Sequence, residues 1–123
     1  MSDYIYVLRT IEPDFVSYGG FRNPERGWVE APDWDGGERV CGGGLHGLPW
    51  GVGCANLLLA DDAIWQAVRV NPADGYVEFG NKCKFRRGYI VKSVPASRKR
   101  EVLDYLVEKG APPDKAVFGR HRT

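Results

Sequence analysis

Four glycines stand within the seven residues from Cys41 to Gly47, and besides Cys41 the segment carries one group that titrates near neutrality, His46. Glycines permit positive φ angles and let a backbone approach a ligand or another strand closely. The segment lacks the Gly-Lys-Ser or Gly-Lys-Thr of a phosphate loop and the spacing of a dinucleotide-binding loop. Two interpretations follow: a ligand loop built around His46, or a bulged strand that crosses a crowded place in a sheet. We favour the strand.

The chain has three cysteines, Cys41, Cys54 and Cys83, and an odd count favours reduced thiols over a disulfide framework. Together with His46 they are the right ligand types for zinc. Structural zinc sites usually begin with two ligands two to four residues apart, and this spacing is absent, so we expect no metal. Cys83 lies between two lysines in an alternating segment, which predicts that its thiol points inward.

Basic residues are dense between residues 82 and 100. By alternation, three of them share one strand face, and three more stand together at the start of a predicted helix, where the helix dipole disfavours cations. Contacts to phosphates or to an acidic protein surface would use such a face, whereas a solvated face balanced by acidic residues elsewhere explains it equally well. The binding residues expected here are Lys82, Lys84, Arg86, Arg87, Arg98, Lys99 and Arg100.

The four tryptophans divide by context. Trp34 and Trp50 stand in or beside predicted loops, and exposed tryptophans are common anchors of binding surfaces, so we add both to the candidate binding residues. Trp28 and Trp65 stand in predicted strands, where we expect them to fill the core.

The elements that must position these residues are short strands and one helix. Alternating or β-branched segments predict strands at 4–10, 28–30, 39–46, 64–70, 76–79 and 82–94, with a bulge at Arg87-Gly88. The first strand is expected to be central, and the last three to form an antiparallel meander. Leu48 to Gly51 is expected to turn, and 52–60 to form helical turns. A helix is predicted from Ala96 to Lys109, ended by Gly110 and Pro112.

Length and composition fit one folded domain. The chain has 123 residues, 43% of them hydrophobic and 27% charged. We therefore predict an α+β fold, a mostly antiparallel twisted sheet of about five or six strands with one C-terminal helix, over residues 1–113, followed by a basic tail at 114–123. No segment has the length of a membrane span and the N-terminus is not a signal peptide, so a cytoplasmic location is expected.

Charge is unevenly distributed along the chain. The net charge is +1, yet residues 1–62 carry ten acidic and four basic side chains, whereas residues 63–123 carry thirteen basic and six acidic ones. Such asymmetry fits either a charged partner surface or two halves that neutralise each other in the fold, and we favour neutralisation.

The order of motifs resembles that of a small domain of unknown function found in phage and bacterial genomes, which has a cysteine shortly before Gly-Leu-His or Gly-Phe-His. The matching segments are Tyr4–Thr10, Gly20-Phe21, Gly27-Trp28-Val29, Cys41 with Gly44-Leu45-His46, Ala67–Val70 and Lys82–Phe85. The resemblance implies a phage or mobile-element accessory protein in the host cytoplasm.

Many such small proteins inhibit host-defence complexes, including CRISPR complexes, by binding. Our first hypothesis is therefore a non-catalytic inhibitor without a cofactor, whose partner is a protein or ribonucleoprotein complex with an acidic or phosphate-bearing surface. The basic residues and the loop tryptophans named above would form its binding surface.

Two alternatives stay open. The chain also has a weaker likeness to ADP-ribosyltransferase-like folds, which implies that Arg9 and His46 would hold NAD and that Glu78 would polarise its ribose, although the Ser-Thr-Ser and His-Tyr-Glu sets of such enzymes are missing. The other alternative, which the basic stretch supports, is a protein that binds nucleic acid independently of sequence.

Overall fold

The fold is an antiparallel sheet with a C-terminal helix, as predicted, and in the described part of the chain the sheet has seven strands instead of five or six. The computed structural model describes residues 4–17, 20–37, 43–52, 61–79 and 82–111. Its strands are β1 (Ile5–Ile11), β2 (Gly27–Glu30), β3 (Leu45–Pro49), β4 (Ile64–Val70), β5 (Tyr76–Phe79), β6 (Lys82–Phe85) and β7 (Arg87–Pro95). A 3-10 turn, η2 (Pro72–Asp74), precedes β5, and η3 (Ala96–Arg98) leads into α1 (Lys99–Glu108).

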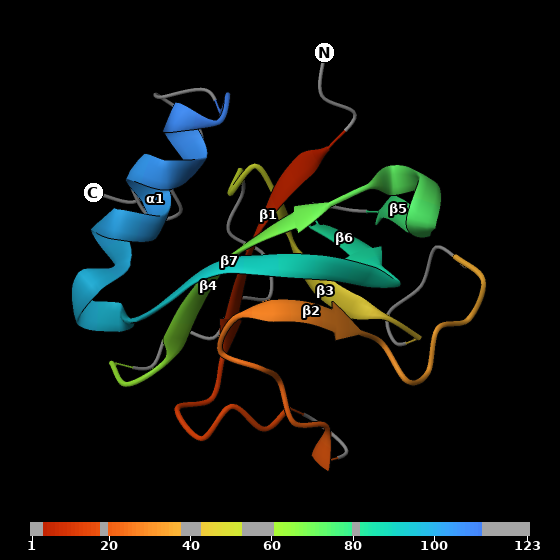
Figure 1. The fold of residues 1–123 in the computed structure, drawn as a ribbon, viewed down its shortest axis with the longest axis horizontal. Coiled ribbons are helices and arrows are strands. Elements are labelled where there is room, and N and C mark those ends of the chain that lie inside the picture. Colours follow the sequence, from red (N-terminus) through yellow and green to blue (C-terminus); the bar gives the residue numbers. More distant parts are fainter. Residues whose placement is uncertain (1–3, 18–19, 38–42, 53–60, 80–81, 112–123) are drawn as a thin grey trace.

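The sheet is strongly curled. Its strand order is β2-β7-β4-β1-β3-β6-β5, and every pairing is antiparallel. Only Arg86 separates β6 from β7 along the chain, although β4, β1 and β3 lie between them in the sheet. The Ala31 N–H after β2 also donates to the Arg86 carbonyl at 2.7 Å. The sheet must therefore bend round on itself, as its ribbon shows (Figure 1).

Two apolar clusters fill the two faces of this sheet. The inner cluster lies inside the curl and draws residues from six strands, among them Val7, Val68 and Phe85. The outer cluster lies between the sheet and α1, which packs on β4 and β7 through Val102, Leu103 and Leu106. Strand β4 is thus covered on both faces along most of its length, which is why its residues 65 to 68 are all buried.

The predicted meander is wrong for β4. Strands β5 and β6 do form a hairpin, but β4 pairs with β1 and β7, and β6 pairs with β3 and β5. A strand that is apolar on both faces is most stable in the middle of the sheet, and the first strand, which is equally apolar, takes the place beside it. The prediction that the first strand is central is confirmed.

Strand β3 lies later in the sequence than predicted. It runs to Pro49, through residues expected to turn, because Leu48 is fully buried in the outer cluster, and the turn begins at Trp50. The expected bulge at Arg87-Gly88 is also wrong: the register shift between β4 and β7 lies at Ala67/Val68. The expected strand residues 39–42, most of the expected helical turns at 52–60, and the tail at 114–123 lie outside the described residues.

The helix agrees with its prediction apart from its first residues, which form η3. None of the helices in the described ranges is both long and apolar enough to span a membrane.

Candidate functional site: an aromatic–arginine row

Four neighbouring strands each place one large side chain in a straight line across the outer face of the sheet. Trp28 of β2 is paired with Tyr89 of β7, Tyr89 with Arg69 of β4, and Arg69 with Tyr6 of β1. Residues directly opposite each other in antiparallel strands point to the same face and touch. We call these four residues the aromatic–arginine row.

The members of the row stack on one another. The Trp28 and Tyr89 rings meet edge to face, with centroids 5.4 Å apart and planes at 88°. The Arg69 guanidinium lies 5.1 Å from the Tyr89 ring centroid and 4.9 Å from that of Tyr4, so it is held between two tyrosines. At the β2 end, the Arg87 guanidinium lies 4.4 Å over the Trp28 ring. Cation–π contacts of this kind order both partners.

Arg69 carries a charge that no acid offsets in the described part of the chain. None of the ion pairs formed there includes Arg69, and its buried Nε atom has no hydrogen-bond partner there. Arg87 reaches Asp74 only at 4.0 Å, with both side chains more than a third exposed, and such pairs contribute little. The row therefore presents positive charge among aromatic rings.

The β2 end of the row is open to solvent because α1 stops beside it. The helix covers the part of the same face formed by Trp65 and Ala67, whereas Trp28 is 55% exposed and Tyr4 42% exposed. The prediction that Trp65 fills the core is confirmed, since it is 2% exposed, and the same prediction for Trp28 is wrong. Strand β2 lies at the edge of the sheet and turns Val29 inward, so Trp28 must point outward.

Aromatic residues continue past Tyr6 toward the helix. The Tyr6 ring lies 5.8 Å from the Trp50 ring and 5.8 Å from the Tyr105 ring of α1. Lys109 lies 5.4 Å over the Tyr105 ring. We call Trp50 and Tyr105 the second platform. Trp50, expected as an exposed loop anchor, is half-buried in these contacts.

The basic residues expected to form one binding face are largely paired with acids. Arg98 donates two hydrogen bonds, of 2.6 and 2.9 Å, to the Glu101 carboxylate, and the Lys99 ammonium lies over the Trp65 ring at 5.3 Å. The other pairs are Lys84–Asp35, Arg86–Glu30, Arg87–Asp74, Lys92–Glu101 and Arg100–Asp104.

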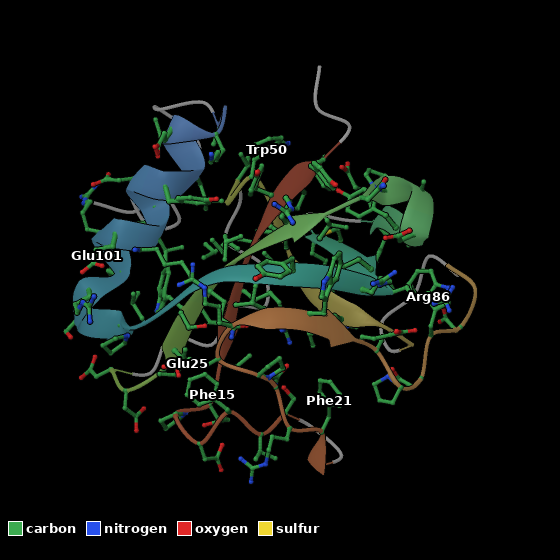
Figure 2. All side chains as sticks on the ribbon, in the orientation of Figure 1. Phe15, Phe21, Glu25, Trp50, Arg86 and Glu101 are labelled. Carbon is green, nitrogen blue, oxygen red and sulfur yellow. The ribbon has the colours of Figure 1, made fainter. Side chains whose placement is uncertain are left out.

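These basic residues also do not form one patch. Lys84 has no solvent exposure, and its Nζ atom lies 2.6 Å from Asp35 Oδ2. Arg86 lies at the opposite side of the molecule from Glu101, the partner of Arg98 (Figure 2). Lys82, whose ammonium lies 5.3 Å over the Phe79 ring, belongs to the Arg86 side of the sheet, on the β5–β6 hairpin.

Trp34 covers the glycines around the Lys84–Asp35 pair. Atoms of its ring would lie 3.1 Å from a Cβ atom added at Gly44 or at Gly75. The indole therefore packs flat on backbone that has no side chains, and it is only half-exposed.

Of the three residues in the NAD hypothesis, Arg9 and His46 lie on neighbouring strands and Glu78 lies at the edge of the sheet. Arg9 is on β1, His46 on β3 and Glu78 on the edge strand β5, with β3 and β6 between Arg9 and Glu78. Glu78 is exposed and accepts a hydrogen bond of 2.6 Å from the Tyr76 hydroxyl. The NAD hypothesis stays a prediction.

Arg9 holds a loop to the sheet. It is 5% exposed, and it donates to Gln66 Oε1 at 3.2 Å and to Asn23 Oδ1 at 3.1 Å. Asn23 in turn donates to the Phe15 carbonyl and to Ser17, within the loop whose Phe15 and Phe21 are labelled in Figure 2. Burial lowers the pKa of Arg9 to about 10, so the buried guanidinium stays charged at neutral pH.

His46 is half-buried against the Phe79 ring, 6.2 Å away, and next to Lys84 in the pairing of β3 with β6. Burial, followed by the charges of Lys82, Lys84 and Arg9, lowers the pKa of His46 below 6.5. Gly47 beside it lies in a crowded place, as predicted: an added Cβ would meet Val7 Cγ1 and, at 2.6 Å, the Leu8 carbonyl oxygen. Cys83 points inward as predicted and is fully buried, whereas Cys41 and Cys54 lie outside the described residues.

Sequence reasoning missed all four members of the row, Trp28, Tyr89, Arg69 and Tyr6, as functional candidates. The alternation of β4 correctly placed Arg69 on the face of Trp65 and Ala67. What the sequence did not reveal is that β2 and β7 continue this face and that the helix leaves it open.

No protein-family model, curated protein or solved structure matches the chain. The resemblance to the phage and bacterial domain accordingly stays a prediction.

Proposed function

We propose that the protein binds single-stranded nucleic acid on the aromatic–arginine row. The observation that carries this proposal is the row itself: three rings and a guanidinium in line on four strands, with Trp28 more than half exposed. Proteins that bind single strands combine aromatic side chains, on which bases stack, with cations that contact the backbone.

The charges of the row fit phosphates. Arg69 is held between two rings with no acid beside it in the described ranges, and Arg87 lies over the exposed indole of Trp28. A guanidinium on an aromatic face keeps its edge free to donate hydrogen bonds, and phosphate oxygens are its usual acceptors.

Unpaired strands fit this surface better than duplexes. Stacking on Trp28 requires a base whose face is accessible, and the bases of a duplex are already stacked on their neighbours. Stacking also tolerates any base, so we expect weak sequence preference.

The experiment is a titration of a fluorescent oligothymidylate of eight nucleotides, followed by anisotropy, with wild-type protein and Trp28→Ala. Loss of one stacked base costs about 1–3 kcal/mol, which is a loss of affinity of about 5- to 150-fold. Val77→Ala, which removes a partly exposed apolar side chain on β5 at the other edge of the sheet, should bind like the wild type.

Equal affinities of wild type and Trp28→Ala would contradict the proposal, as would the absence of binding by the wild type at low salt. Tighter binding of a duplex than of the single strand would contradict it as well. The host-defence inhibitor expected from the resemblance stays a prediction, and a ribonucleoprotein target would offer the same row an RNA strand.

A further inference from the structure

The aromatic surface continues beyond Tyr6 to Trp50 and Tyr105. We propose that one continuous strand runs from Trp28 across β1 to the second platform, so that the protein selects strands long enough to reach both ends. This inference rests on the proposed function and specifies its ligand.

The second platform is joined to the row through Tyr6. The Tyr6 ring is tilted by 49° to the Trp50 ring and by 72° to the Tyr105 ring, each with centroids 5.8 Å apart. Tyr6 is also the partner of Arg69 in the β1–β4 pairing. Rings and cations therefore stand on each successive strand from the edge strand β2 to β1, and ring contacts of Tyr6 extend the surface to helix α1.

The backbone at Trp50 is held in a conformation that bulky residues avoid. Its φ is 59°, in the left-handed region, and the next residue, Gly51, also has a positive φ, of 71°. The Trp50 N–H donates to the Tyr6 carbonyl at 2.7 Å, and the Gly51 and Val52 N–H groups close the turn onto Leu48 and Pro49. This conformation fixes the indole against Tyr6, and strained positions of this kind cluster at ligand-binding and active sites.

Cations stand at both ends and in the middle of this path. Arg87 lies over Trp28 at the β2 end, Arg69 lies between the tyrosines, and Lys109 lies over Tyr105 at the helix end. Strands β2 and β1 are three places apart in the sheet, which corresponds to about 14 Å. At about 3.4 Å per stacked nucleotide, this distance takes about four nucleotides.

The experiment compares oligothymidylates of two and eight nucleotides, by competition against the fluorescent strand, for the wild type and for two variants of the second platform. Trp50→Asn removes the ring and keeps a residue that tolerates positive φ. Tyr105→Leu removes the other ring and keeps an apolar contact for α1. Thermal melting establishes whether each variant is folded. If Trp50→Asn does not fold, the comparison is made with Tyr105→Leu alone.

We expect the wild type to bind eight nucleotides at least tenfold more tightly than two. The variants should lose about tenfold for the long strand and less than twofold for the short one. If the variants bind the long strand like the wild type, or lose equally at both lengths, the continuous path is wrong. The proposed function survives that result as long as the wild type binds the single strand and Trp28→Ala weakens that binding.

Discussion

Lys84 carries an ammonium group at a position with no solvent exposure, and its acid partner, Asp35, is 22% exposed. The pair ties the loop that carries Trp34 to strand β6. Removing one member of a buried pair leaves the other charge without its compensation, which costs more than the pair itself contributes.

We therefore expect Asp35→Asn to lower the free energy of unfolding by about 3 kcal/mol, measured by urea denaturation. Glu30→Gln is the matched control, because it removes the acid from the Arg86 pair, in which both side chains are about half exposed at 52% and 54%. That variant should lose less than 1 kcal/mol. Equal losses of unfolding free energy in the two variants would show that the burial of Lys84 does not determine the loss of stability.

Among the elements, the strands whose side chains alternate were predicted well. The faces of β4 follow directly from its sequence, because residues two apart in a strand must share a face, and β5 and the helix are found where their patterns place them. The partners of β4 could not be predicted in this way. They depend on contacts between segments far apart in the sequence, which alternation within one strand does not specify.

The candidate site shows the same division. Trp28 was predicted to be buried because tryptophan in a strand usually is, yet its exposure depends on β2 being an edge strand and on where α1 ends. The basic residues were predicted to act together because they are close in sequence. The fold separates Arg86 from the helix and pairs most of the cations with acids.

Strand β3 can approach β1 closely because it has a glycine, Gly47, at the point of contact. The strands are so close that a Cβ at Gly47 would meet Val7, the Leu8 carbonyl oxygen and Arg9. Gly47→Ala should therefore lower the free energy of unfolding by about 1–3 kcal/mol, because backbone cannot move aside as a side chain can. The measurement is the midpoint and slope of urea denaturation.

Gly44→Ala is the control from the same segment. Its added Cβ would meet the ring of Trp34 at 3.1 Å, and a half-exposed side chain can shift by a few tenths of an ångström. We expect a smaller loss there. A larger loss at Gly44 than at Gly47 would mean that the close approach of β1 and β3 is not what requires glycine.

At the scale of the whole molecule, the charge asymmetry of the sequence is partly cancelled by folding. Asp35 and Glu30, from the acidic half, pair with Lys84 and Arg86 from the basic half. Among the described residues, four further pairs lie within the basic half. The overall field is therefore weak, in keeping with a net charge of +1, and binding of a polyanion must depend on local cations such as Arg69.

The salt dependence of binding separates local contacts from the overall field. Each phosphate contact on a single strand changes the slope of log K against log salt by about 0.7, so three contacts, at Arg69, Arg87 and Lys109, predict a slope of about −2. Arg69→Gln should make this slope less steep by about 0.7 and weaken binding. The measurement is a set of anisotropy titrations between about 50 and 200 mM salt.

A triple variant, Arg98→Gln with Lys99→Gln and Arg100→Gln, removes three charges from exposed positions on η3 and α1. If the field of the whole molecule drew the strand in, this variant would weaken binding more than Arg69→Gln does, because it changes the net charge by three units instead of one. We expect the reverse order, since Glu101 already pairs with Arg98 through two hydrogen bonds and none of the three cations belongs to the row. If the triple variant binds the single strand more weakly than Arg69→Gln does, the binding surface lies on the helix and not on the strands.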